Sequence, residues 1–309
     1  MRTVIVAPAL VLALAWPVAS ATAAGADDGY TDGGLKVVGL TTDQRLVSFS
    51  TNSPSSQESW GQVRGLQGDT ELVGIDYRVQ NGKLYGVGDQ GGIYTLDRNG
   101  NATKVSQLTV ALQGDNFGVD FNPAANRLRV ISDTGQNLRH NIDDPAAPFT
   151  TTVDGTLTNP AVPPATTPTT ALGVTGAAYT NNDLNTATAT TLFDIDTVND
   201  RVSLQSPANA GTLAPTGSLG VNAGPSAGFD IYYAPQAGTN QGFAALQTNG
   251  TNAIYGFYRV NILNGKADRV AHFPTSRQVF DIALPLNQHY REPSDDMHTG
   301  SEGMTPRTK

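Results

Sequence analysis

The sequence predicts an all-β fold, most simply a β-propeller built as a ring of five four-stranded sheets. Three observations lead to this prediction. Short apolar runs rich in β-branched and aromatic residues alternate with Gly, Asn and Asp turn signals. The same order of four such runs recurs along the chain. The first and last segments each supply the part of a unit that the other lacks, which is expected when a ring closes and hides its sheet edges.

The clearest repeat begins at GIDYR, where short runs are separated by Asn-Gly and Gly-Gly turn signals. Such turns join antiparallel neighbours, so the repeat predicts a four-stranded meander. Its predicted strands are residues 72–78, 83–88, 93–97 and 102–108.

Three further copies follow in the same order. The next copy has three strands in residues 118–143 and a fourth in 149–157. The remaining predicted strands are 176–182, 190–196, 201–207 and 213–220 in one copy, and 228–235, 242–250, 253–261 and 266–273 in the other.

The ends of the chain complete one more unit. Residues 35–67 offer only three strands, predicted at 35–43, 45–51 and 59–67, and the apolar segment 279–284 is an inner strand without followers. We therefore expect five blades. A six-bladed ring remains an alternative, because residues 160–170 or the first segment could conceal strands, and a two-domain β-sandwich arrangement is a second one. The Pro- and Thr-rich residues 160–170 are expected to form an exposed loop, since Pro cannot donate to a ladder.

The N-terminus indicates export. Arg2 precedes an apolar run at residues 4–18 and an Ala-rich stretch at 19–24, as in a signal peptide that would be cleaved after Ala23 or Ala24. The run is shorter than the roughly 20 residues that a retained anchor would need. We expect a signal peptide at 1–24, a flexible N-terminal segment at 25–34, the propeller at 35–286, a disordered polar tail at 287–309, and a secreted, extracellular location. The chain has no Cys, so no disulfide supports it.

The charge balance limits the partners. The chain has 19 basic and 27 acidic residues, and removal of Arg2 with the signal leaves 18 minus 27, a net charge of −9. Such a protein binds polyanions poorly, so neither nucleic acid nor an anionic membrane is the expected partner. We expect a monomer that recognises an extracellular ligand and does not insert into a membrane after cleavage.

The amino-acid sequence of the repeats resembles that of a known family. The stretch GVDFNPAANRLRVISDTGQNLR, with GIDYR and GKLYGVGD before it and TTLFDID and AGFDIYY after it, is similar to the secreted bacterial family catalogued as domain of unknown function (DUF4394). The resemblance covers roughly residues 36–285. It implies an exported, propeller-like domain of unassigned activity, and it brings no catalytic residues with it.

One acidic position recurs in the first strand of the repeats. Alignment places Asp76, Asp120, Asp230 and Asp281 at equivalent positions, with Ala178 in the remaining copy. Since first strands line the channel of a propeller, these four residues could form a carboxylate ring that holds a cation such as Ca²⁺. Alternatively, each carboxylate could accept backbone N–H groups from the neighbouring blade and lock the blades together. The second interpretation is favoured, because repetition in successive blades is typical of packing; no metal and no other cofactor is assigned.

Other candidate residues have structural explanations. Asp43, Asp89, Asp133, Asp196 and Asn249 end second strands and begin turns, where we expect them to accept N–H groups two residues on. Ser226 lies in a G-x-S-x-G pattern, but a strand follows it and not the helix that a nucleophile elbow needs. The four His residues are isolated and lack metal-ligand spacing.

Two functional classes stay open. The preferred one is a noncatalytic secreted propeller that presents its loops to a protein, glycan or small molecule, with Trp60 as a possible stacking residue. The alternative is a metal-assisted hydrolase or lactonase that uses the four ring aspartates around a channel ion. Catalytic residues are unassigned in either case.

Overall fold

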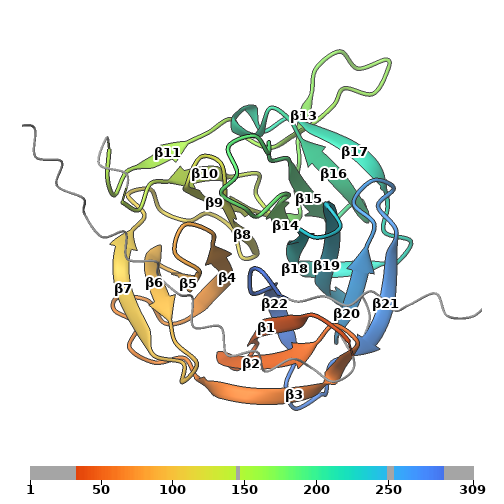
Figure 1. Cartoon of the computed structure of the whole chain (residues 1–309). Helices are drawn as coiled ribbons and strands as arrows, with labels where there is room; N and C mark the ends of the chain where they lie inside the picture. Colours follow the sequence, from red (N-terminus) through yellow and green to blue (C-terminus); the bar gives the residue numbers. More distant parts are fainter. Residues whose placement is uncertain (1–32, 144–146, 249–253, 289–309) are drawn as a thin grey trace, which may run out of the picture.

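A computed structural model describes residues 33–143, 147–248 and 254–288. Five four-stranded antiparallel sheets are arranged around a central axis as the blades of a propeller (Figure 1). The predicted fold class and blade number are therefore confirmed, and the six-bladed and β-sandwich alternatives are wrong. Among the described residues the only helical turn is one 3₁₀ turn, Ala208–Ala210.

Each blade runs from an inner strand to an outer strand, and we number the blades along the chain. Blade 1 contains β22 (Val279–Ala283), β1 (Lys36–Thr41), β2 (Arg45–Ser50) and β3 (Ser53–Gln62). Blade 2 contains β4 (Leu72–Arg78), β5 (Lys83–Gly88), β6 (Gly92–Leu96) and β7 (Ala102–Gln107). Blade 3 contains β8 (Phe117–Asn122), β9 (Arg127–Ser132), β10 (Asn137–His140) and β11 (Thr151–Val153).

The remaining blades follow the same plan. Blade 4 contains β14 (Val174–Tyr179), β15 (Leu192–Asp196), β16 (Arg201–Gln205) and β17 (Leu213–Ser218). Blade 5 contains β18 (Ala223–Ala234), β19 (Thr239–Thr248), β20 (Tyr255–Val260) and β21 (Ala267–His272).

Blade 1 closes the ring with strands from both ends of the described chain. The inner strand β22 pairs antiparallel with β1, with Val38 opposite Ala283 and Leu40 opposite Asp281. Gln288, just after β22, holds this junction, because its side chain accepts from the Lys36 N–H (2.6 Å) and donates to the Lys36 carbonyl (2.9 Å).

The hydrophobic core is divided among the five junctions between blades. Each of five buried clusters draws its side chains from two neighbouring blades, and one cluster joins blade 5 to blade 1. No blade therefore has a complete core of its own. This explains why the alternating apolar residues of a single repeat require the next repeat for burial.

Two segments differ from the sequence prediction. The third strand of blade 1 was expected at 59–67 but begins at Ser53 and ends at Gln62, because polar residues 53–59 pair with β2 through an irregular register. The Pro- and Thr-rich segment is largely exposed, as expected, but its ends pair as two short strands, β12 (Thr158–Asn159) and β13 (Thr169–Thr170). The chain between them projects away from the ring (Figure 1).

Several predictions fall on residues outside the described ranges: the signal peptide, most of segment 25–34, the tail from 289 onward, and Asn249. Within the described residues, no helix has the length and apolar character needed to cross a membrane.

Candidate functional site

The four aligned aspartates lie on the inner strands that surround the axis: Asp76 on β4, Asp120 on β8, Asp230 on β18 and Asp281 on β22. All four are buried, with exposures between 1% and 6%. Ala178 lies on the inner strand β14 of blade 4, so this blade contributes no carboxylate. The sequence alignment thus identified four buried positions on inner strands around the axis.

Glycines two residues before Asp76, Asp120 and Asp230 let the inner strands approach one another. A Cβ on Gly74 would lie 2.5 Å from Val119 Cγ2, and one on Gly228 would lie 2.5 Å from Asp281 Cα. A Cβ on Gly118 would lie 2.8 Å from the Ala177 nitrogen. Because real Cβ atoms do not approach other atoms this closely, the Gly-x-Asp pattern combines a glycine needed for close approach with an acceptor beside it.

Each carboxylate accepts a hydrogen bond from a backbone N–H of the next blade around the ring. The donors are Phe121 to Asp76 (2.8 Å), Tyr179 to Asp120 (3.2 Å), Leu284 to Asp230 (2.6 Å) and Ile75 to Asp281 (2.7 Å). This is the arrangement expected of carboxylates that join neighbouring blades.

The second oxygen of a ring carboxylate can accept from the N–H of the following residue only if the preceding blade has not already taken that N–H. Asp76 and Asp230 accept from the N–H of their own following residues, Tyr77 and Ile231, both at 2.6 Å. The equivalent N–H after Asp120 is already taken, because Phe121 donates to Asp76. As a result, the second oxygen of Asp120, Oδ2, is buried and accepts no hydrogen bond from any described residue.

Burial raises the pKa of all four carboxyl groups. The pKa values of Asp76, Asp120 and Asp281 lie well above the usual range, and the charges of neighbouring ring aspartates raise them further. Burial also raises the pKa of Asp230, to about 6. Asp76, Asp120 and Asp230 each bring one oxygen within 4.8 Å of the others, and are the described ring residues that have the geometry to share a metal ion.

The second set of acids acts as acceptors, but from donors other than the predicted N–H groups two residues on. Asp196 accepts from the Asn199 N–H (2.9 Å), three residues on, and Asp43 accepts from Thr41 Oγ1 (2.5 Å). Asp89 accepts from the N–H groups of Thr70 (2.7 Å) and Glu71 (3.3 Å), and Asp133 accepts from the Asn116 N–H (3.1 Å). These donors precede the inner strands of the same blades and do not lie two residues on. The two aspartates therefore anchor the connections that enter blades 2 and 3.

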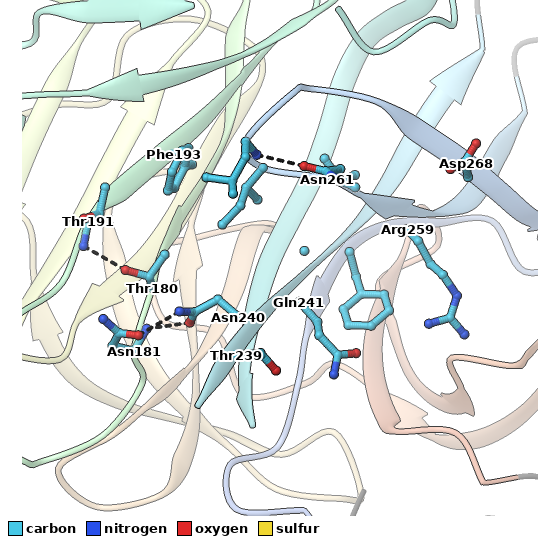
Figure 2. Close-up of a pocket in the computed structure, with 15 residues that line it drawn as sticks. Thr180, Asn181, Thr191, Phe193, Thr239, Asn240, Gln241, Arg259, Asn261 and Asp268 are labelled. Carbon is cyan, nitrogen blue, oxygen red and sulfur yellow. Dashed lines mark hydrogen bonds between the residues drawn. The ribbon is translucent and has the colours of Figure 1, made fainter. Parts of the chain in front are cut away.

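A cavity with a volume of about 720 Å³ lies between blades 4 and 5 (Figure 2). Its apolar surface comes from Phe193, Phe243, Val260, Ile262 and Leu263. Its polar surface consists mainly of hydroxyl and amide groups, together with Arg259 and Asp268; the polar neutral residues are Thr180, Asn181, Thr191, Thr239, Asn240, Gln241 and Asn261.

Hydrogen bonds across the two blades hold part of this surface in place. The Asn181 N–H donates to Asn240 Oδ1 (2.8 Å), and Asn240 Nδ2 donates to Asn181 Oδ1 (2.7 Å), as Figure 2 shows. Arg259 donates to Asn52 Oδ1 (2.6 Å) and lies over the Phe243 ring, and Asp268 pairs with Lys266 at 2.7 Å. The charged groups of the cavity therefore have protein partners already.

A second cavity, of about 660 Å³, opens among blades 3, 4 and 5 where their inner strands begin. It is lined in part by Asp115, Asp133 and Asp200. Asp133 and Asp200 accept backbone N–H groups there, from Asn116 and Ala223. None of the four ring aspartates lines either cavity.

The other residues that the sequence raised have structural roles. Ser226 lies within strand β18, which excludes a nucleophile elbow. Trp60 is partly buried against the core of blades 1 and 2, with the Arg98 guanidinium 5.3 Å from its ring. His140 is fully buried, contacts Ser106 Oγ (2.8 Å) and Thr151 Oγ1 (2.9 Å), and has a pKa lowered to about 4 by burial. The Thr151 hydroxyl, and not a carboxylate, orients this imidazole. Ser106, His140 and Thr151 therefore lack the acid of a catalytic triad.

Sequence reasoning missed the cavity between blades 4 and 5. Its residues come from the turn after β14, the start of β19 and the turn after β20, and no shared motif marks them. The one available signal was the density of Thr, Asn and Gln in these turns, which is also typical of ordinary loops.

The fold and these sites define a five-bladed β-propeller with an axial aspartate ring and a polar cavity between two blades. Comparison with known families identifies it further. The model of the domain of unknown function (DUF4394) matches residues 45–283, so the chain belongs to this family.

No curated protein matches the chain. Among solved structures, a Bacteroides thetaiotaomicron protein of unknown function is similar at 12% identity, with 82% of this chain and 65% of that chain covered and a TM-score of 0.45. TolB from Acinetobacter baumannii is similar at 13% identity, 77% and 53% coverage and a TM-score of 0.41. An auxiliary nutrient binding protein from Bacteroides ovatus is similar at 13% identity, 66% and 55% coverage and a TM-score of 0.40. This chain thus spans about half the length of TolB and of the nutrient binding protein.

Proposed function

We propose that the protein is an exported, noncatalytic binding protein that holds an uncharged, hydroxyl-rich ligand, such as a neutral sugar, in the cavity between blades 4 and 5. The observation that carries this proposal is the cavity itself. Its volume of about 720 Å³ falls within the range of roughly 300–1,000 Å³ typical of small-molecule sites.

The polar groups of the cavity suit a neutral ligand. Thr191, Thr239 and Gln241 have no side-chain hydrogen bond to any residue within the described ranges, and together offer two hydroxyls and one amide. Each of these groups both donates and accepts, as sugar hydroxyls do. Arg259 and Asp268 are engaged by Asn52 and Lys266, which reduces their attraction for a charged ligand.

The apolar groups supply the remaining contact surface. Phe193 and Ile262 belong to the core shared by blades 4 and 5, so their positions are fixed by packing. The Asn181 and Asn240 pair adds two hydrogen bonds across the same junction. A site held in this way loses little conformational freedom on binding, which favours affinity.

The hydrolase alternative lacks an accessible site. A metal-assisted hydrolase needs an open position at its metal for substrate. Asp76, Asp120 and Asp230 are 5%, 1% and 2% exposed, and their oxygens accept backbone N–H groups of the same or the next blade. The ring therefore supports a structural role more than contact with a substrate.

Calorimetric titration with a panel of neutral and charged mono- and oligosaccharides tests the proposal. We expect a neutral sugar to bind and to be recovered unchanged by mass spectrometry. Gln241→Ala should weaken binding about tenfold, the loss of roughly one to two hydrogen bonds. Gln113→Ala, at an exposed glutamine outside the cavity, is the matched control. Binding of charged sugars alone, or equal affinity in both variants, would contradict the proposal.

Export is tested separately. Expression of the full chain in a secreting bacterial host should yield extracellular protein whose first residue follows Ala23 or Ala24. Retention in the cells with an intact Met1 would refute the export part of the proposal and leave the binding part to the titration.

A further inference from the structure

The axial ring brings three carboxylates from separate blades to one place. Asp76 of blade 2, Asp120 of blade 3 and Asp230 of blade 5 each have one oxygen within 4.8 Å of the others. These residues are 44 to 154 positions apart in the sequence, so only closure of the ring assembles them. They are almost completely buried, which makes their mutual repulsion strong.

No basic side chain offsets these charges. Within residues 33–143, 147–248 and 254–288, no Lys, Arg or His forms an ion pair with Asp76, Asp120 or Asp230. Their described hydrogen-bond partners are backbone N–H groups. A buried carboxylate cluster of this kind needs either protons or a cation.

Asp120 provides an independent sign of a missing partner. Its Oδ1 accepts from Tyr179, but its Oδ2 is buried and has no hydrogen-bond donor among the described residues. Such orphan acceptors are rare in protein interiors and call for a bound water or ion. Blade 4, where Ala178 replaces an aspartate, adjoins Asp120 and supplies no carboxylate at this point.

We propose that Asp76, Asp120 and Asp230 bind one Ca²⁺ ion on the propeller axis, and that this ion stabilises the closed ring. A carboxylate oxygen that accepts one N–H keeps a second lone pair, so the backbone hydrogen bonds and the ion are compatible. This site is separate from the ligand cavity, because none of its residues lines that cavity.

The spacing and the burial of the three carboxylates favour Ca²⁺ over Mg²⁺. Ca²⁺ binds oxygen at about 2.3–2.6 Å, so two of its ligand atoms lie up to roughly 5 Å apart. Mg²⁺ binds at about 2.0–2.1 Å, which limits the separation to roughly 4.2 Å. Oxygens that all lie within 4.8 Å of one another fit the span of Ca²⁺. Mg²⁺ also gives up its waters reluctantly, which disfavours it at three almost fully buried carboxylates.

The test measures metal content and thermal stability of the purified protein. The protein is treated with EGTA and then dialysed against about 1 mM CaCl₂, which is in excess of a micromolar dissociation constant. We expect close to one Ca²⁺ per chain. Ca²⁺ should raise the melting temperature by about 5 °C or more over EGTA, and MgCl₂ by much less.

Two variants separate this site from calcium bound at the surface. Asp120→Asn should lose the ion and the thermal shift. The matched control is Asp194→Asn, which changes an aspartate on β15 that is equally buried and also has oxygens without a donor among the described residues, but that lies outside the three-carboxylate group. This variant should keep both responses.

The metal content of the unaltered protein decides the matter even if Asp120→Asn does not fold. A content near zero, a Mg²⁺ shift equal to that of Ca²⁺, or an unchanged calcium shift in Asp120→Asn would overturn the proposal. Failure here leaves sugar binding unaffected, and the reverse also holds, so the two proposals fail independently.

Discussion

The closing strand β22 gives the sharpest prediction about stability. Ending the chain at residue 278 removes Val279, Ile282 and Leu284, which are 0%, 1% and 2% exposed. Burial of each such side chain contributes roughly 1.5–3 kcal/mol, so the loss is about 5–9 kcal/mol before any ladder hydrogen bonds are counted. This is comparable to the roughly 5–15 kcal/mol that stabilises a typical protein. We therefore expect the shortened chain to be largely unfolded.

Circular dichroism and urea titration measure the effect. The control chain ends at residue 288, which keeps β22 and the Gln288 contacts with Lys36. A synthetic peptide of residues 279–288 should restore a cooperative unfolding transition to the shortened chain. If the chain that ends at 278 unfolds with the same midpoint and cooperativity as the control, the ring does not depend on this strand and the reasoning is wrong.

Three further predictions concern buried groups. Arg129 is fully buried and donates to Asp154 at 2.7 Å, so Arg129→Ala should lower the free energy of unfolding by about 3–5 kcal/mol in urea titrations, whereas a loss below about 1 kcal/mol would refute the role of this pair. His140 has a folded-state pKa of about 4, below its unfolded value, so the free energy of unfolding should fall as pH drops from about 6.5 to 4. NMR titration should give that pKa, and His140→Gln should flatten the dependence of stability on pH. Burial raises the pKa of Asp194, so stability changes with pH in the opposite direction and is lost as pH rises above the unfolded pKa of about 3.9. Asp194→Asn should therefore stabilise the protein at pH 7 but not at pH 3.

The sequence predicted the parts of the fold that repeat. The alternation of apolar strands and Gly or Asn turns located the five blades, because each repeat must bury its apolar residues against the next. Alignment of the repeats also identified Asp76, Asp120, Asp230 and Asp281 as equivalent positions of the inner strands. Sequence repeats predict these positions because equivalent residues of successive repeats occupy equivalent places in successive blades.

The details that break the repetition could not be predicted. Asp76 and Asp120 accept from the residue after the aligned position of the next blade, whereas Asp281 accepts from Ile75, which lies before it. These offsets depend on how the inner strands are staggered around the axis, which no local pattern records. The cavity between blades 4 and 5 likewise depends on turns of two blades, and the residues that line it share no motif.

The shared construction of blade 1 also affects when the protein can fold. Because β22 follows every other described strand in the chain, a growing polypeptide can assemble the sheets of blades 2 to 5 while the inner edge of β1 still lacks its partner. The ring can close only after the residues of β22 have emerged, since domains fold as their strands become available during synthesis. Late closure therefore leaves the inner edge of β1 without its partner until nearly all of the described chain has been synthesised.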